Sequence, residues 1–149
     1  MEREFILLKP DTVQRGLVGE VIKRIENTGL KLIAMKFLQV TQDMAEKHYA
    51  VHKERPFYPN LVKYITSGPT VAMVVEGPNA VVKTRNVVGA THPKDAPLGT
   101  IRGDFAIDIG RNLIHASDSV ENSTYETGIY FTEEEMVSWI PIRQPWVVE

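Results

Sequence analysis

A histidine flanked by polar residues marks the part of this 149-residue chain most able to carry chemistry. Residues 111–118 read RNLIHASD, which places His115 at the end of a predicted strand and just before a predicted helix. The free N–H groups and dipole at a helix N-terminus favour a bound phosphoryl group. A histidine held at one ring nitrogen by a carboxylate or hydroxyl can act as a nucleophile or base, and Ser117, Asp118 or Glu126 could supply that partner. A histidine that merely packs at the strand end would have the same spacing.

Three basic residues elsewhere in the chain could bind phosphate. Arg102 lies between Gly99 and Gly103, which permit close backbone approach, and a guanidinium can bind phosphate through two parallel hydrogen bonds. Lys9 ends the first predicted strand, and Arg85 lies on a predicted helix. Each has a plainer alternative: a loop arginine at the surface, a lysine extending to water, or a solvated helix charge.

Other catalytic patterns are weak or absent. His48 and His52 are four residues apart on a predicted helix, which suits a shared metal ion, but no third ligand follows at a convincing spacing. The common glycine-rich phosphate loops, the H-E-x-x-H zinc motif and the G-x-S-x-G nucleophile elbow do not occur. The chain has no cysteine, which excludes disulfides and thiol chemistry. Phosphate chemistry would therefore use something other than a glycine-rich loop.

The composition predicts one globular domain over residues 1–149. Hydrophobic residues make up 43% of the chain, and the formal net charge of −2 gives no basic field for nucleic acid. No apolar run reaches the roughly 18 residues of a membrane span, and the N-terminus lacks the pattern of a signal peptide. We expect a cytoplasmic protein that does not contact a membrane.

The hydrophobic pattern alternates between strand and helix periods along the chain. Strands are expected at 5–8, 30–40, 71–75 and 112–116, and helices from 17 to the glycine at 29, then at 41–53, 59–67, 80–88 and 118–127. Without its insertions this order is β-α-β-β-α-β. The prediction is an α/β (α+β) ferredoxin-like fold, a four-stranded antiparallel sheet covered by helices. One sheet face would carry the helices, and the other is a candidate subunit interface.

Local signals refine this picture at three places. The Pro- and Gly-rich stretch 91–110 predicts a long loop, and loops of that length in a compact domain are usually functional or disordered. Asp118 and Glu121 have capping-box spacing for the helix expected to end at Gly128. Thr132 and Glu135 repeat that spacing before a last short helix.

Residues 112–119, NLIHASDS, resemble the active-site signature of nucleoside diphosphate kinases. The resemblance extends over essentially the whole chain and in register. It includes LKPD at 8–11, QRGLVG at 14–19, HY at 48–49, RPF at 55–57, SGP at 67–69 and GTIRGDF at 99–105. Ala116 departs from the family pattern, because many relatives have glycine there.

This resemblance implies an enzyme that transfers phosphoryl groups by a ping-pong mechanism. His115 would accept the γ-phosphoryl of ATP or another nucleoside triphosphate at its δ nitrogen and pass it to a nucleoside diphosphate. Glu126 and Ser117 would orient the imidazole. The other roles implied are contacts to the phosphates and ribose by Lys9, Tyr49, Arg85, Thr91, Arg102 and Asn112, and contacts to the base by Phe57, Leu61 and Ile109. Mg²⁺ would be carried on the nucleotide phosphates and not by a protein cage.

The resemblance also bears on partners. The tail through residues 144–146 is similar to the C-terminal extension of hexameric members, so a homo-oligomer, and specifically a hexamer, is expected. A different hypothesis is a nucleotide- or RNA-binding module without catalysis on the same scaffold. The acidic balance and the lack of paired exposed aromatics on the predicted strands argue against it, so no obligatory nucleic-acid partner is expected.

Overall fold

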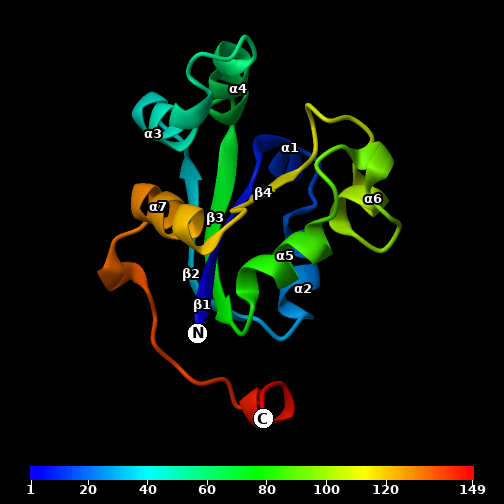
Figure 1. Cartoon of the computed structure of the whole chain (residues 1–149), viewed down its shortest axis with the longest axis vertical. Helices are drawn as coiled ribbons and strands as arrows, with labels where there is room; N and C mark the ends of the chain where they lie inside the picture. Colours follow the sequence, from blue (N-terminus) through cyan, green and yellow to red (C-terminus); the bar gives the residue numbers. More distant parts are fainter.

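The computed structural model describes all residues, 1–149, and is built around one antiparallel sheet of four strands. The strands are β1 (Glu2–Leu8), β2 (Lys31–Gln39), β3 (Pro69–Gly77) and β4 (Ile114–Ala116), in the spatial order β2-β3-β1-β4 (Figure 1). β1 is central and pairs with both β3 and β4. This arrangement confirms the ferredoxin-like prediction.

Seven α-helices connect and cover the strands. They are α1 (Pro10–Gln14), α2 (Val18–Glu26), α3 (Gln42–His48), α4 (Tyr58–Ile65), α5 (Ala80–Val88), α6 (Ile101–Phe105) and α7 (Val120–Tyr130). Short 3₁₀ turns occupy Ala50–His52, Pro93–Asp95, Glu133–Glu135 and Gln144–Trp146. The predicted helix at 80–88 is confirmed exactly, whereas the predicted helix at 41–53 divides into α3 and a 3₁₀ turn.

Both faces of the sheet carry helices, so the expectation that only one face would carry them is wrong. On β1, Ile6 and Leu8 face a core that includes residues of α2 and α5. Phe5 and Leu7, which point the other way, pack in a second core with residues of α3, α4 and α7. Because successive side chains of a strand alternate between faces, the unbroken apolar run of β1 supplies both cores.

Helix α7 differs from its prediction at both ends. Ser119, not Asp118, is the N-cap, and its hydroxyl accepts a hydrogen bond from the Asn122 backbone N–H. The helix passes Gly128 and ends at Tyr130, whose ring lies 4.8 Å from that of Phe5. Tertiary packing at this end therefore outweighs the local cost of a helical glycine, about 1 kcal/mol.

The 91–110 stretch is more ordered than a plain loop. It contains the 3₁₀ turn Pro93–Asp95 and helix α6, whose N-cap Thr100 accepts a hydrogen bond from the Gly103 N–H. A Cβ on Gly103 would lie 2.0 Å from the carbonyl oxygen of Pro97, so only glycine fits there. This close approach folds the segment back on itself beside α5, as Figure 1 shows.

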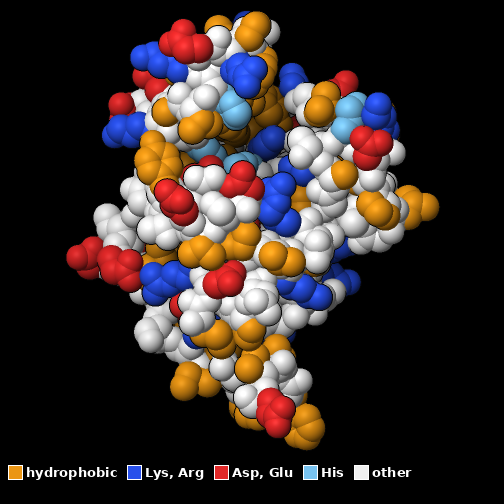
Figure 2. Space-filling model, in the orientation of Figure 1, with side chains coloured by type: hydrophobic (Ala, Val, Ile, Leu, Met, Phe, Trp, Pro, Cys, Tyr) orange, Lys and Arg blue, Asp and Glu red, His pale blue; other side chains and the backbone are white.

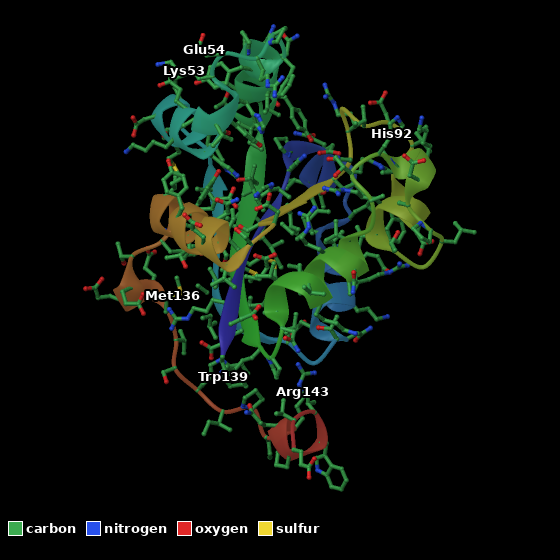
Figure 3. All side chains as sticks on the ribbon, in the orientation of Figure 1. Lys53, Glu54, His92, Met136, Trp139 and Arg143 are labelled. Atoms are coloured by element: carbon green, nitrogen blue, oxygen red, sulfur yellow. The ribbon has the colours of Figure 1, made fainter.

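The C-terminal segment runs along the β2 side of the molecule. The Val137 N–H donates to the Ile33 carbonyl, and the Trp139 indole N–H donates to the Leu32 carbonyl. Figure 3 shows Trp139 and Arg143 on this tail, away from the end of the molecule that carries α4. None of the helices is both long and apolar enough to span a membrane.

Candidate active site

β4 places His115 on the sheet face covered by α3 and α7. His115 pairs in register with Leu7 of β1, and its ring lies 6.2 Å from that of Phe5. The surface above it is hollowed between the α3–α4 end and the 91–110 segment, with histidine and Lys/Arg atoms inside (Figure 2). His115 is thus reached from a cavity and backed by the protein core.

Glu126 fixes the orientation of the His115 ring. Its two carboxylate oxygens lie 2.9 and 3.0 Å from Nε2 of His115, and the buried Ser117 hydroxyl donates to the same carboxylate. Helix periodicity produces this contact: the buried stripe of α7 is Ser123, Glu126 and Tyr130, spaced three and four residues apart. An ionised carboxylate only accepts, so Nε2 carries the hydrogen and Nδ1 keeps its lone pair.

The charge states follow from burial and from these partners. Burial holds the pKa of His115 below its usual value of 6.5, although the hydrogen bond to Glu126 opposes that shift. Burial raises the pKa of Glu126, but the hydrogen bond from His115 and the close approach of His48 outweigh it and keep that pKa below 4.5. At neutral pH the pair is therefore a neutral imidazole hydrogen-bonded to a carboxylate.

His48 is a second buried histidine at this carboxylate. Its Nε2 lies 2.7 Å from Oε2 of Glu126, and its Nδ1 lies 2.8 Å from the Tyr130 hydroxyl oxygen. The buried positions of α3 and its C-cap are Ala45, His48 and Tyr49, a helical i, i+3, i+4 stripe toward the core. His52, the other histidine of the i, i+4 pair, also lines the cavity and lies beside Phe57 with ring centroids 5.3 Å apart.

Lys9, Asn112 and Thr91 form one polar chain across the cavity wall. The Lys9 ammonium donates to Oδ1 of Asn112 at 2.8 Å, and Nδ2 of Asn112 donates to the Thr91 carbonyl at 2.9 Å. Burial, followed by the charge of Arg102, lowers the pKa of Lys9 to about 8. Lys9 therefore remains mostly cationic at neutral pH.

Arg102 and Arg85 bind the backbone around β4. Arg102 is 6% exposed and donates to the carbonyls of Asn112, Gly89 and Ile114, while Arg85 donates to the Ala116 carbonyl. Burial lowers the pKa of Arg102 to about 10, so it stays charged. A guanidinium has five N–H donors. Two donor groups of Arg102 hold the segment around β4 and a third holds the C-terminal end of α5 at Gly89, and the remaining hydrogens are available to an anion in the cavity that Arg102 lines.

A strained turn precedes the histidine. Leu113 has φ of 74°, and the Ile114 N–H donates to the Asn112 carbonyl at 2.8 Å across it. For a bulky residue this conformation costs about 1–3 kcal/mol. Lys9 N–H and the Thr12 hydroxyl both donate to the Leu113 carbonyl. The Leu113 N–H donates to Asp11. These bonds hold the turn that directs Asn112 toward Lys9.

One cavity of about 380 Å³ brings most of the predicted residues together. Its lining includes nine of them: Lys9, Tyr49, Leu61, Arg85, Thr91, Arg102, Asn112, His115 and Glu126. Ser117 lies buried behind Glu126, whereas Phe57 and Ile109 are outside the lining and about half exposed. Figure 3 shows Lys53 and Glu54 beyond α3 on one side of this end of the molecule and His92 on the other.

Sequence reasoning missed several lining residues. His48 was given no role beyond a weak metal pair and the HY motif, Asp118 was considered for the site only as a partner for His115, and Asn122 was not assigned to the site, although all three line the cavity. The signal for His48 was its spacing. Ala45 lies three residues before it and Tyr49 one residue after it, and this helical pattern of buried positions indicated a buried ring. No local signal pointed to Tyr130, because its contact with His48 joins residues 82 positions apart.

The lining suits a metal ion carried by a ligand better than a protein-held one. Besides Glu126, which is bound to His115, Asp118 is the only carboxylate in the lining, and it already accepts from Asn122. Lys9, Arg85 and Arg102 place three positive charges at the same cavity. A Mg²⁺ ion, which prefers several oxygen ligands, would fit there with phosphate and water oxygens as its main ligands.

The fold and this cavity together define a ferredoxin-like α/β protein with a histidine-centred, cation-lined anion site. Comparison with known proteins gives the family: residues 2–136 match the family model described as nucleoside diphosphate kinase. The chain belongs to this family, whose activity is phosphoryl transfer from nucleoside triphosphates to nucleoside diphosphates.

Named relatives match along their full length. The chain is 56% identical over 149 residues to a nucleoside diphosphate kinase of Trichormus variabilis, covering 100% of both chains. It is also 56% identical over 149 residues to one of Archaeoglobus fulgidus, covering 100% of this chain and 99% of that protein. Sequence identity this high over the full length shows membership of the family and not a shared fold alone.

Solved structures agree closely with the fold. A family protein from Babesia bovis superposes with a TM-score of 0.97 at 46% identity, covering 99% of this chain and 100% of that one. The nucleoside diphosphate kinase of Halobacterium salinarum, solved in complex with CDP, superposes with a TM-score of 0.96 at 45% identity and covers 99% of both chains.

Proposed function

We propose that His115 accepts the γ-phosphoryl group of a nucleoside triphosphate, typically ATP, on Nδ1 and passes it to a nucleoside diphosphate. The observation that carries this proposal is the contact of Nε2 with Glu126 at 2.9 Å. It leaves Nδ1 as the free nitrogen of a neutral ring that lines the cavity. The Nδ1 lone pair forms the N–P bond as the bond to the β-phosphate oxygen breaks, and the return transfer reverses these changes.

Charge neutralisation and alignment are the protein's main tasks in such a transfer. Lys9, Arg85 and Arg102 line the cavity and would bind phosphate oxygens. Mg²⁺ bound to the nucleotide would supply further positive charge, with Asp118 as the available protein carboxylate beside it. Tyr49, Thr91 and Asn112 would contact phosphate or ribose oxygens.

Glu126 and Ser117 hold the reacting ring during both transfers. When Nδ1 is phosphorylated, the ring keeps its Nε2 hydrogen and becomes positively charged, and the Glu126 carboxylate 2.9 Å away stabilises that charge. Ser117 in turn donates to Glu126. Both residues are thus proposed to orient His115 from the Nε2 side of its ring, opposite the reacting nitrogen.

The base would be bound loosely at the rim. Phe57 is half exposed at the N-terminus of α4, and Leu61 one turn later lines the cavity, so a base could stack there. Ile109 is exposed on the other side. Stacking does not depend on which base is present. We therefore expect ATP, GTP and pyrimidine nucleotides all to react, maintaining triphosphate pools in the cytoplasm, where these substrates are used.

A homo-oligomer is part of the proposal, and a hexamer is the expected form. Large apolar side chains remain exposed along β2 and the tail: Met35, Phe37, Ile140, Ile142 and Trp146. Exposed apolar groups on a sheet edge favour association with another chain. Light scattering on the purified protein would give six times the chain mass for a hexamer.

The test of the function is a labelling experiment. The protein is incubated with γ-labelled ATP and Mg²⁺, freed of nucleotide, and then given unlabelled GDP. We expect an acid-labile, base-stable adduct on His115 that moves into GTP. A folded, nucleotide-binding protein that forms no adduct would contradict the proposal and favour a binding module.

A further inference from the structure

His48 makes contacts that the phosphotransfer proposal does not yet use. Its side chain is 1% exposed and is enclosed by other rings. Tyr49 stacks on it with centroids 4.6 Å apart and an interplanar angle of 11°, and His115 meets it edge-on at 4.6 Å and 74°. The ring therefore has one fixed orientation, and its two nitrogens face Glu126 and Tyr130.

Only one arrangement of hydrogens satisfies both contacts. Oε2 of the ionised Glu126 lies 2.7 Å from Nε2 of His48, so Nε2 must carry the hydrogen. Nδ1 then has a lone pair, and the Tyr130 hydroxyl, 2.8 Å away, must donate to it. In the opposite tautomer, the Nε2 lone pair would face a carboxylate oxygen, and the two would repel each other.

The burial of Tyr130 strengthens this assignment. The residue is 3% exposed, its hydroxyl makes no hydrogen bond other than that to His48, and burial raises its pKa above the usual value of 10. The hydroxyl therefore stays protonated and has one acceptor within reach. Tyr130 and Glu126 also lie on the same buried stripe of α7, four residues apart, so one helix holds both ends of the contact chain.

We propose that Tyr130 and His48 are positioning residues for the phosphotransfer, acting through Glu126. The inference rests on the proposed function of His115. Tyr130 selects the His48 tautomer, and His48 then places its Nε2 hydrogen beside the Glu126 carboxylate, 2.7 Å away but outside hydrogen-bond geometry, next to the hydrogen bonds from Ser117 and His115. The carboxylate, contacted by all three groups, keeps the His115 ring turned so that Nδ1 faces the cavity.

This arrangement makes a prediction about protons as well as position. His48 keeps its Nε2 hydrogen throughout, so no proton is transferred along the chain of contacts. Without that hydrogen, Glu126 would have one donor fewer, and its carboxylate would attract a proton or a protonated His115 more strongly. The remaining groups near the carboxylate are Ser117 just after β4, Lys9 beyond His115, Glu4 of β1 and Tyr49 after α3, and none replaces the lost donor.

The test uses three variants of the full-length protein. His48→Leu removes the donor, His48→Gln keeps an N–H at a similar reach, and Tyr130→Phe removes only the hydroxyl. Tyr125→Phe is the matched control, because Tyr125 lies on the same helix but is half exposed and donates to the Lys47 carbonyl. The readout is the single-turnover rate of His115 phosphorylation by labelled ATP from pH 5 to pH 9, with the melting temperature of each variant.

We expect His48→Leu to phosphorylate about 10- to 100-fold more slowly with nucleotide affinity unchanged, the scale of effect for a misplaced reacting group. The acid limb of its pH profile moves to higher pH, and His48→Gln recovers much of the rate. Tyr130→Phe slows about fivefold, the effect of one neutral hydrogen bond. Tyr125→Phe matches wild type. A wild-type rate and profile in His48→Leu, or a loss no greater than its loss of folded protein, overturns the inference.

Nitrogen-15 NMR of wild-type protein tests the same point without any variant that could misfold. We expect His48 to carry its hydrogen on Nε2, and the opposite tautomer would overturn the proposal. The two hypotheses fail differently. Absence of a phosphohistidine in wild type contradicts the proposed function, whereas a normal adduct formed equally fast without His48 contradicts only the positioning role.

Discussion

Two buried carboxyl groups of this molecule, Glu126 of α7 and Glu4 of β1, have opposite electrostatic properties. Glu126 is 7% exposed and receives hydrogen bonds from Ser117 and His115, and its pKa lies below the usual range. Glu4 is fully buried, and neither of its carboxyl oxygens has a hydrogen-bond partner. Burial, with a smaller contribution from the nearby Glu126 charge, raises the pKa of Glu4 to about 9.

The two pKa values differ because of the hydrogen-bond donors around each carboxyl group, and not because of burial. Near Glu4 the available polar groups are already bonded elsewhere: the Phe5 N–H donates to the Ser123 hydroxyl, which donates to the Arg3 carbonyl. Desolvation, with the nearby Glu126 charge, then keeps Glu4 protonated. Around Glu126 the donors outweigh desolvation. A buried carboxyl is thus ionised only where the fold supplies donors.

The largest effect comes from removing the group that Glu126 orients. His115→Ala should lower nucleoside diphosphate phosphorylation by about 10⁴-fold or more, as expected for loss of a nucleophile. The melting temperature should change little, because His115 is partly exposed to the cavity. Steady-state exchange assays and thermal melts measure the two effects. Substantial turnover in this variant would remove Glu126 from any catalytic role.

Neutralising Glu126 itself is expected to have the next largest effect. Glu126→Gln keeps the size of the side chain but adds an N–H₂ that must face one of the donors Ser117, His48 or His115. We expect a fall of about 10²-fold in phosphorylation rate, within the range for a positioned acid–base partner. Rapid-quench measurement of adduct formation gives the rate. An unchanged rate would mean that the ring is oriented by packing alone.

Neutralising Glu4 should have the opposite consequence: more stability and unchanged activity. The folded-state pKa of about 9 exceeds the unfolded value of 4.5, so wild type loses stability as pH rises between those values. The maximal slope is about 1.4 kcal/mol per pH unit. Glu4→Gln should melt several degrees higher at pH 8 than wild type, with little difference at pH 4.5. Equal stability curves for the two proteins would show that Glu4 is not buried as a neutral acid.

An exposed carboxylate, Glu133, is expected to have the smallest effect on stability. Glu133 pairs with Arg3 at 3.1 Å, but its side chain is 77% exposed. Water screens such pairs, so Glu133→Gln should move the melting temperature by no more than about 1 °C. A larger shift in calorimetry would mean that the ion pair contributes to the packing of the Glu133–Glu135 turn on β1.

The sheet and most helices could be predicted because their apolar periodicity is local and strong. The Thr132–Glu135 capping box was correctly assigned, since it is a contact within four residues. Helix α7 was wrongly ended at Gly128, because what extends it is the packing of Tyr130 on Phe5, 125 positions away. The helix α6 was missed because glycine and proline suggested a loop, whereas Gly103 is required by its approach to Pro97.

The residues of the site likewise divide into those that the sequence predicted and those that it did not. Its histidine and charged residues were candidates from residue type and position, most of the uncharged ones were named through the resemblance to a family, and nine of the twelve predicted residues line the cavity. His48 and Tyr130, which we propose act through Glu126, were not assigned to the site. Their significance lies in distances to Glu126 and to each other, and no spacing in the sequence encodes those distances.

The central claim is that Glu126 binds Nε2 of His115 and so leaves Nδ1 as the nucleophile. Phosphorus and nitrogen-15 NMR of the phosphorylated, full-length protein measures which ring nitrogen carries the phosphoryl group. The account predicts phosphorus bonded to Nδ1, with a hydrogen retained on Nε2. Phosphorus on Nε2 would contradict it, because that nitrogen lies 2.9 Å from the Glu126 carboxylate and would have to leave it to react.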